Sequence, residues 1–140
     1  MKYWDTSAIL PLLTQETATE QRRLQLEEDP LIVTWWATQV ECVSALSRLL
    51  REGTLSEDAY EQILRDLREL SAGWVEVQPT ERLRRRAVRL LRVHSLRAAG
   101  ALQLAAALIV SGENPQTLPF ACADPRLERA ARAEGFPLAG

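Results

Sequence analysis

Three acidic residues stand where expected elements of structure begin or end, and they are the candidates for chemistry. Asp5 follows the short apolar run of residues 1–4, Asp124 follows the apolar run of residues 118–123, and Glu41 lies in an otherwise apolar segment. Each has an ordinary explanation, because an Asp after a strand often caps the next helix and a Glu on a helix usually faces solvent. Three converging carboxylates would repel one another unless cations neutralised them, and such oxygen ligands suit Mg²⁺ or Mn²⁺.

The elements that must position these acids alternate between strands and helices. Strands are expected at residues 1–4, 31–35, 74–77 and 118–123, with an added edge strand at 136–138, and helices at 8–13, 14–28, 37–51, 56–72, 83–92, 98–110 and 125–134. This alternation predicts an α/β three-layer fold with a mostly parallel central sheet flanked by helices. In such sheets functional groups gather outside the carboxyl ends of the strands, where the first and fourth strands deliver Asp5 and Asp124.

Composition favours one domain over residues 1–140, because 46% of the 140 residues are hydrophobic and can bury a core. The net charge is −2, so the overall field does not attract nucleic acid and any RNA contact must be local. Cys42 and Cys122 lack metal-ligand spacing and are expected as buried free thiols. No segment resembles a signal peptide or a membrane span, which predicts a cytoplasmic protein without membrane contact.

Other residue types are weaker candidates. Five arginines on one side of the expected helix 83–92 could contact phosphates, but an ordinary solvated face is the favoured explanation for them: Arg82, Arg85, Arg86, Arg89 and Arg92. His94 has no neighbour at ligand spacing and is expected to pack or to lie on the surface. Packing in the core or at an interface is favoured over base stacking for Trp4, Trp35, Trp36 and Trp74, and Trp36 is the best candidate for an exposed one.

Four motifs occur in an ordered set over essentially the whole chain. They are Asp5-Thr6-Ser7 after an apolar strand, Glu41 in a helix, the segment Leu-Arg-Ala-Ala-Gly-Ala-Leu-Gln-Leu-Ala at 96–105, and Ala-Asp-Pro-Arg-Leu at 123–127. In this order and spacing the motifs make the chain resemble the PIN-domain family, in particular its VapC-type toxin ribonucleases.

The resemblance implies an endoribonuclease that depends on Mg²⁺ or Mn²⁺ and forms the toxin of a toxin-antitoxin pair. Its partners would be an RNA substrate, a cognate antitoxin protein and a second copy of the chain in a homodimer. The catalytic and metal-binding residues carried over by position are Asp5, Glu41 and Asp124. Thr6 or Ser7 would hydrogen-bond Asp5 or the scissile phosphate, and Arg85 and Arg89 are candidates for contact with RNA phosphates.

The chain departs from the family pattern at two positions. Gly100 stands where the family normally has a further acid, and Cys122 stands where it often has threonine. Inside a helix, glycine is about 1 kcal/mol less favourable than alanine, so its presence needs a structural reason. Close packing of the helix on the sheet is the structural explanation to test. A missing carboxylate predicts weaker metal affinity and impaired turnover.

Two function classes therefore stay open. Gly100 favours a catalytically weakened or inactive PIN fold that binds RNA or an antitoxin. The three acids favour an enzyme, because three carboxylates without a bound metal would repel the phosphates of RNA and would not suit a module that only binds it. An aspartyl-phosphate hydrolase is poorly supported, since Thr6, Ser7 and Ala8 offer no second acid after Asp5. The phosphate-binding and nucleophile-elbow motifs of other α/β enzymes are also missing from the sequence.

Overall fold

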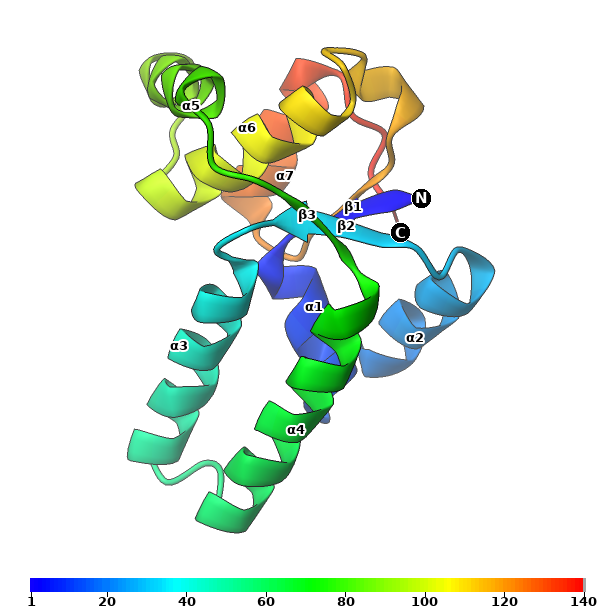
Figure 1. Ribbon diagram of the computed structural model, residues 1–140, viewed down its shortest axis with the longest axis vertical. Helices are drawn as coiled ribbons and strands as arrows, with labels where there is room; N and C mark the ends of the chain where they lie inside the picture. Colours follow the sequence, from blue (N-terminus) through cyan, green and yellow to red (C-terminus); the bar gives the residue numbers. More distant parts are fainter. Residues whose placement is uncertain (140) are drawn as a thin grey trace.

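The computed structural model describes residues 1–139, and Figure 1 shows the path of the chain. The strands are β1 (Lys2–Trp4), β2 (Ile32–Trp35), β3 (Val75–Val77) and β4 (Phe120–Ala121). The helices are α1 (Thr6–Leu13), α2 (Thr19–Glu28), α3 (Thr38–Arg51), α4 (Glu57–Gly73), α5 (Glu81–Val93), α6 (Ala98–Val110) and α7 (Pro125–Glu134), with a short 3₁₀ helix at Pro115–Thr117.

The four strands form one sheet in the order β3-β2-β1-β4, and each neighbouring pair is parallel. Tyr3 of β1 pairs with Val33 on one side and with Phe120 on the other. Parallel neighbours need crossover connections, and the helices between successive strands supply them. The predicted α/β fold with a mostly parallel sheet is confirmed, and the carboxyl ends of β1 and β4 lie side by side.

Helices cover both faces of the sheet and make the three layers (Figure 1). Because side chains alternate along a strand, Tyr3 and Val33 pack in one apolar cluster with α5, α6 and α7. Trp4 and Ile32 point to the other face and pack with residues of α1, α3 and α4. Residue pairs adjacent in sequence thus contribute to two different cores.

Several predicted boundaries and faces are wrong. The helix expected over 14–28 is α2, which begins only at Thr19. The tail at 136–138 makes an isolated bridge between Phe120 and Leu138 rather than a strand. The helical spacing of apolar residues in 37–51 and 83–92 predicts buried stripes that include Val40 and Leu91. These two side chains are 67% and 41% exposed, so α3 and α5 are each buried along a narrower stripe than their apolar residues suggest.

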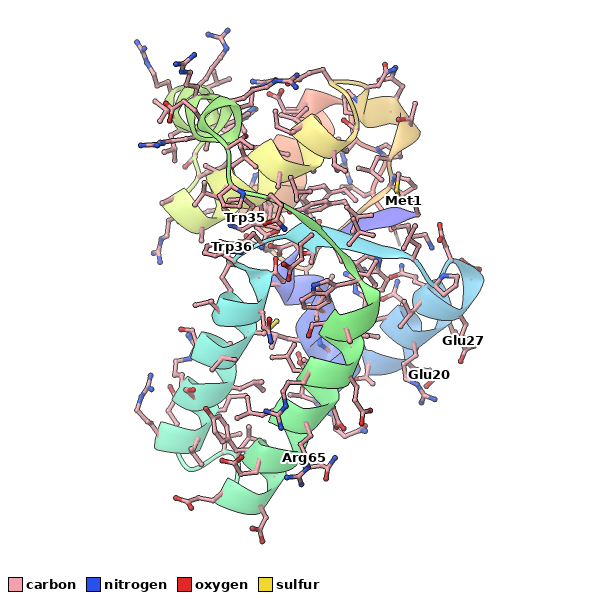
Figure 2. All side chains as sticks on the ribbon, viewed as in Figure 1. Met1, Glu20, Glu27, Trp35, Trp36 and Arg65 are labelled. Carbon is pink, nitrogen blue, oxygen red and sulfur yellow. The ribbon has the colours of Figure 1, made fainter. Side chains whose placement is uncertain are left out.

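The remaining expectations about burial are confirmed. Cys42 and Cys122 are free and buried. Trp4, Trp35 and Trp74 are buried, whereas Trp36 is 50% exposed. Figure 2 shows Trp35 and Trp36 together where β2 leads into α3. Within residues 1–139, no helix combines the length and apolar character needed to cross a membrane.

Candidate active site

Asp5 lies at the carboxyl end of β1 and begins α1 as its N-cap residue. Its carboxylate accepts hydrogen bonds from the backbone N–H of Ser7, at 3.1 Å, and from the Ser7 hydroxyl. The side chain is buried, and burial raises the pKa of Asp5 while the Ser7 hydrogen bonds lower it. The negative charge of Asp124 raises this pKa further. Asp5 therefore caps a helix and also lies within electrostatic reach of a second acid.

Glu41 lies in the first turn of α3, where it is half-buried and interacts electrostatically with Asp5. Its Oε1 atom accepts hydrogen bonds from Thr6 Oγ1 at 2.8 Å and from Gln103 Nε2 at 3.2 Å. Burial raises the pKa of Glu41, the two hydrogen bonds lower it, and the charge of Asp5 raises it. The alternative that Glu41 simply faces solvent is wrong.

Gln103 organises a buried polar network that the sequence reasoning missed. Its Oε1 atom accepts a 2.6 Å hydrogen bond from the Tyr3 hydroxyl. Its Nε2 atom lies within hydrogen-bond distance of Thr6, Thr38 and Glu41. Because the amide oxygen is bound to Tyr3, the amide N–H groups are directed at the Glu41 side of the site. A signal was present, since Gln103 is the one polar side chain in the apolar sequence of α6.

Asp124 lies just beyond β4 and begins α7 as its N-cap residue. Its Oδ1 atom accepts hydrogen bonds from the backbone N–H groups of Arg126, at 2.9 Å, and Leu127, at 3.4 Å. Unlike Asp5, Asp124 is exposed. The caps expected for Asp5 and Asp124 are therefore both present, and they place one buried and one exposed carboxylate at the same edge of the sheet.

Cys122 and Ser7 connect the Asp5 and Asp124 segments. Cys122 Sγ lies 3.7 Å from Asp5 Oδ2 and 3.3 Å from the backbone nitrogen of Asp124. Ser7 Oγ accepts a 2.9 Å hydrogen bond from the backbone nitrogen of Ala123. Burial raises the pKa of Cys122 to about 12, so this side chain is a protonated thiol at neutral pH. Its role here is packing and weak hydrogen bonding rather than thiolate chemistry.

Arg22 of α2 is a second buried polar residue that sequence reasoning missed. Its guanidinium donates to the Cys122 carbonyl at 2.8 Å and to Gln25 Oε1 at 2.9 Å. Burial lowers the pKa of Arg22, whereas the charge of Asp5 raises it. Arg22 therefore ties α2 to the segment that carries Asp124.

Gly100 lies in the first turn of α6 and borders the same cleft as Asp124, with a volume of about 530 Å³. A Cβ atom at this position would lie 3.5 Å from Leu96 Cδ2 and 4.0 Å from Leu127 Cδ1, which are ordinary van der Waals distances. Gly100 is not among the residues with positive φ. Neither packing nor backbone conformation requires glycine here, so the close-packing explanation is wrong.

Comparison with known proteins identifies the family. Residues 2–133 match the model of the PIN domain. The chain belongs to the PIN-domain family. It is 31% identical over 137 residues to Ribonuclease VapC45 of Mycobacterium tuberculosis (strain CDC 1551 / Oshkosh), and equally to Ribonuclease VapC49 of strain ATCC 25618 / H37Rv. Each alignment covers 98% of this chain and 93% of the relative.

The acids of this PIN domain fit a hydrated divalent cation better than a cation enclosed by protein ligands. Among residues 1–139, no three His, Cys, Asp or Glu side chains are arranged to hold one ion. Asp5 nevertheless interacts electrostatically with Asp124 and with Glu41. Mg²⁺ commonly keeps several waters and binds through one or two carboxylates, so Asp5 and Asp124 are the residues that could hold such an ion.

The other predicted site residues have different positions. Ser7 binds Asp5, whereas the Thr6 hydroxyl binds Glu41 instead. Arg85 and Arg89 line a separate hollow on α5, and Arg85 pairs with Glu81. Figure 2 shows many side chains of α5 pointing outward from the sheet. His94 forms a 2.6 Å contact with Glu134, which agrees with the expectation that it packs.

Proposed function

We propose that this PIN domain is a cytoplasmic endoribonuclease that depends on Mg²⁺ or Mn²⁺ and acts as the toxin of a toxin-antitoxin pair. The observation that carries the proposal is that Asp5, at the carboxyl end of β1, interacts electrostatically with Asp124 beyond β4 and with Glu41 of α3, and that burial raises the pKa values of Asp5 and Glu41. Carboxylates whose charge is penalised by burial and by each other gain most from a bound cation. The names of the two relatives, both ribonucleases, support the same activity.

In this proposal the protein residues hold and orient the reacting groups. A bound Mg²⁺ or Mn²⁺ supplies activation of water and charge stabilisation at the phosphate. Asp5 and Asp124 are its ligands, and the Ser7 hydrogen bonds fix the Asp5 carboxylate. Thr6 and Gln103 orient Glu41, whose raised pKa suits it to accept a proton from the attacking water.

Gly100 lowers the expected efficiency of this site. An acid at position 100 would add a carboxylate to the cleft that Asp124 borders, and the local space accepts a side chain. Without it, the metal has one ligand fewer and one negative charge fewer. We therefore expect weak metal affinity and slow turnover.

The second candidate function is binding without cleavage, and Gly100 is the observation that favours it. In that case the fold would hold RNA or an antitoxin while the acid set is too incomplete to keep a metal. Both functions involve RNA or a protein partner, and only the nuclease requires a divalent cation.

Two hollows with apolar lining residues support the proposed protein partners. A hollow of about 660 Å³ between α1, α3 and α4 is lined by Leu10, Leu13, Leu49 and Ile63, among others, and suits an apolar antitoxin segment. Trp36 and Val40 are exposed and line another hollow, of about 580 Å³, which suits contact with a second copy in the proposed homodimer.

A cleavage assay tests the proposal. The purified chain, Gly100→Asp and Asp5→Asn would each be incubated with mixed RNA and either Mg²⁺ or Mn²⁺, with EDTA as the metal-free control. We expect slow cleavage by the chain, at least tenfold faster cleavage by Gly100→Asp, and none by Asp5→Asn. If no form cleaves RNA, the nuclease proposal is wrong and the binding function is favoured.

A further inference from the structure

An arginine-lined cleft adjoins the acidic site on the side of Asp124. It lies where α6 and α7 begin, has a volume of about 530 Å³, and is lined by Arg97, Arg126, Arg129, Gly100 and Asp124, among others. Asp124 is therefore shared between the cleft and the acidic site. A ligand in the cleft would lie directly beside the proposed metal ligands.

The three arginines of this cleft are exposed and unpaired. Within residues 1–139, the side chains of Arg97, Arg126 and Arg129 take part in no ion pair or hydrogen bond. Some arginines elsewhere are paired, such as Arg84 with Glu81 and Arg86 with Glu113. Guanidinium groups without protein partners are free to bind an external anion, and their planar N–H groups match phosphate oxygens in bidentate geometry.

The charge of the cleft contrasts with that of the chain. Three arginines against the one carboxylate of Asp124 leave two positive charges at the cleft, while the whole chain carries a net charge of −2. Because the overall field does not attract RNA, a local positive cleft next to the acids is where a backbone phosphate would be held.

Gly100 contributes to this charge. An aspartate at position 100 would fit without a steric clash and would reduce the excess from two positive charges to one. The glycine therefore removes a possible metal ligand and at the same time keeps the cleft positive. The same substitution must then change metal affinity and phosphate affinity in opposite directions.

We propose that Arg97, Arg126 and Arg129 form a subsite for a backbone phosphate of single-stranded RNA, adjacent to the phosphate at Asp5 and Asp124, and that Gly100 maintains its affinity. The inference rests on RNA being the ligand of the proposed function. It does not require cleavage, because the arginines bind the RNA backbone whether or not a metal is present.

The test measures RNA binding without catalysis. Fluorescence anisotropy of a labelled single-stranded RNA oligonucleotide in EDTA, over a series of salt concentrations, compares the chain with Arg97→Gln/Arg126→Gln/Arg129→Gln. A matched control, Arg51→Gln/Arg65→Gln/Arg68→Gln, removes the same charge at exposed arginines of α3 and α4, away from the cleft; Figure 2 labels Arg65. Circular dichroism melting confirms that both variants fold.

We expect the cleft variant to bind RNA about tenfold more weakly, while the control variant changes little. In a plot of the logarithm of the binding constant against the logarithm of the salt concentration, the slope for the cleft variant should be less steep by about 0.7 for each phosphate that the arginines no longer neutralise. Gly100→Asp should weaken binding in EDTA about threefold, and Gln116→Glu, which adds the same charge at an exposed site, should not. The inference is overturned if cleft and control variants lose affinity equally, or if the chain does not bind RNA in EDTA.

Two further outcomes separate this inference from the proposed nuclease. If the chain never cleaves RNA but the cleft variant loses binding, the subsite stands and the nuclease proposal fails. If the chain cleaves RNA and the cleft variant retains both binding and KM, the subsite is wrong and the nuclease stands. Inorganic phosphate at constant ionic strength distinguishes the phosphate source. If inorganic phosphate displaces the labelled RNA no less effectively than unlabelled RNA at the same phosphate concentration, the cleft is a site for free phosphate and the inference fails.

Discussion

Replacing Gln103 by methionine should destabilise the fold by breaking the buried network behind Glu41. Methionine has a similar length and no branch, so it fills the same space with little cavity or strain. It cannot accept the hydrogen bond that Gln103 accepts from the Tyr3 hydroxyl at 2.6 Å. It also cannot donate to Glu41 or Thr38, although these keep their bonds to Thr6 and Thr34.

The magnitude follows from the buried hydroxyl that loses its acceptor. Tyr3 is fully buried, and the loss of the hydrogen bond that its hydroxyl donates costs about 1–3 kcal/mol. Because Glu41 and Thr38 retain other bonds, their losses add less, and we expect a decrease of about 2–3 kcal/mol in the free energy of unfolding. The lost amide also raises the pKa of Glu41 further, since this hydrogen bond normally lowers it.

Urea unfolding of four proteins measures the effect: the chain, Gln103→Met, Tyr3→Phe and the double variant. The double variant lacks both partners, so it should lose at least about 1 kcal/mol less than the sum of the single losses. Gln116→Met makes the same substitution at an exposed glutamine and should change stability by no more than about 0.5 kcal/mol. Additive losses, or a Gln103→Met loss no larger than that of the control, would refute the network as described.

Three other predictions follow from the site. First, Asp5→Asn should raise the free energy of unfolding in metal-free buffer. Because burial raises the folded-state pKa of Asp5, its charged carboxylate destabilises the fold above that pKa. The stability gained by Asp5→Asn should therefore shrink as the pH falls towards the unfolded-state pKa of about 3.9. Urea unfolding at several pH values checks this, and a gain that grows on acidification would contradict it. Second, Gly100→Ala should raise the free energy of unfolding by up to about 1 kcal/mol, since a Cβ meets only ordinary contacts; a loss in urea unfolding would restore the close-packing explanation. Third, Mg²⁺ should raise the Tm of Gly100→Asp more than that of the chain and should leave Asp5→Asn unchanged, as measured by thermal melting with NaCl of equal ionic strength as the control. Equal shifts in all three proteins would mean that the acids do not bind the ion.

Local sequence patterns determined the order and type of the elements. In the structure Ser56 caps α4, the apolar segment 98–110 forms α6 and Gly135 ends α7, and each of these features depends only on residues within a few positions of one another. The positions of Asp5 and Asp124 at one edge of the sheet were also predictable, because the carboxyl ends of parallel strands meet there. Their burial could not be predicted, and it differs: Asp5 is enclosed by the segments around Ser7 and Cys122, whereas Asp124 is open to solvent.

Only the tertiary structure decided which side chains face the acids. Gln103 and Arg22 come from α6 and α2, far from Glu41 and Cys122 in sequence, and their partners depend on how the helices pack on the sheet. The space at Gly100 and the gathering of Arg97 with Arg129 likewise depend on the packing of α6 against α7. Sequence periodicity reports a face of one helix, but the contact between two faces is set by packing across the whole core. The acids were therefore visible in the sequence, and the residues that position them and surround them were not.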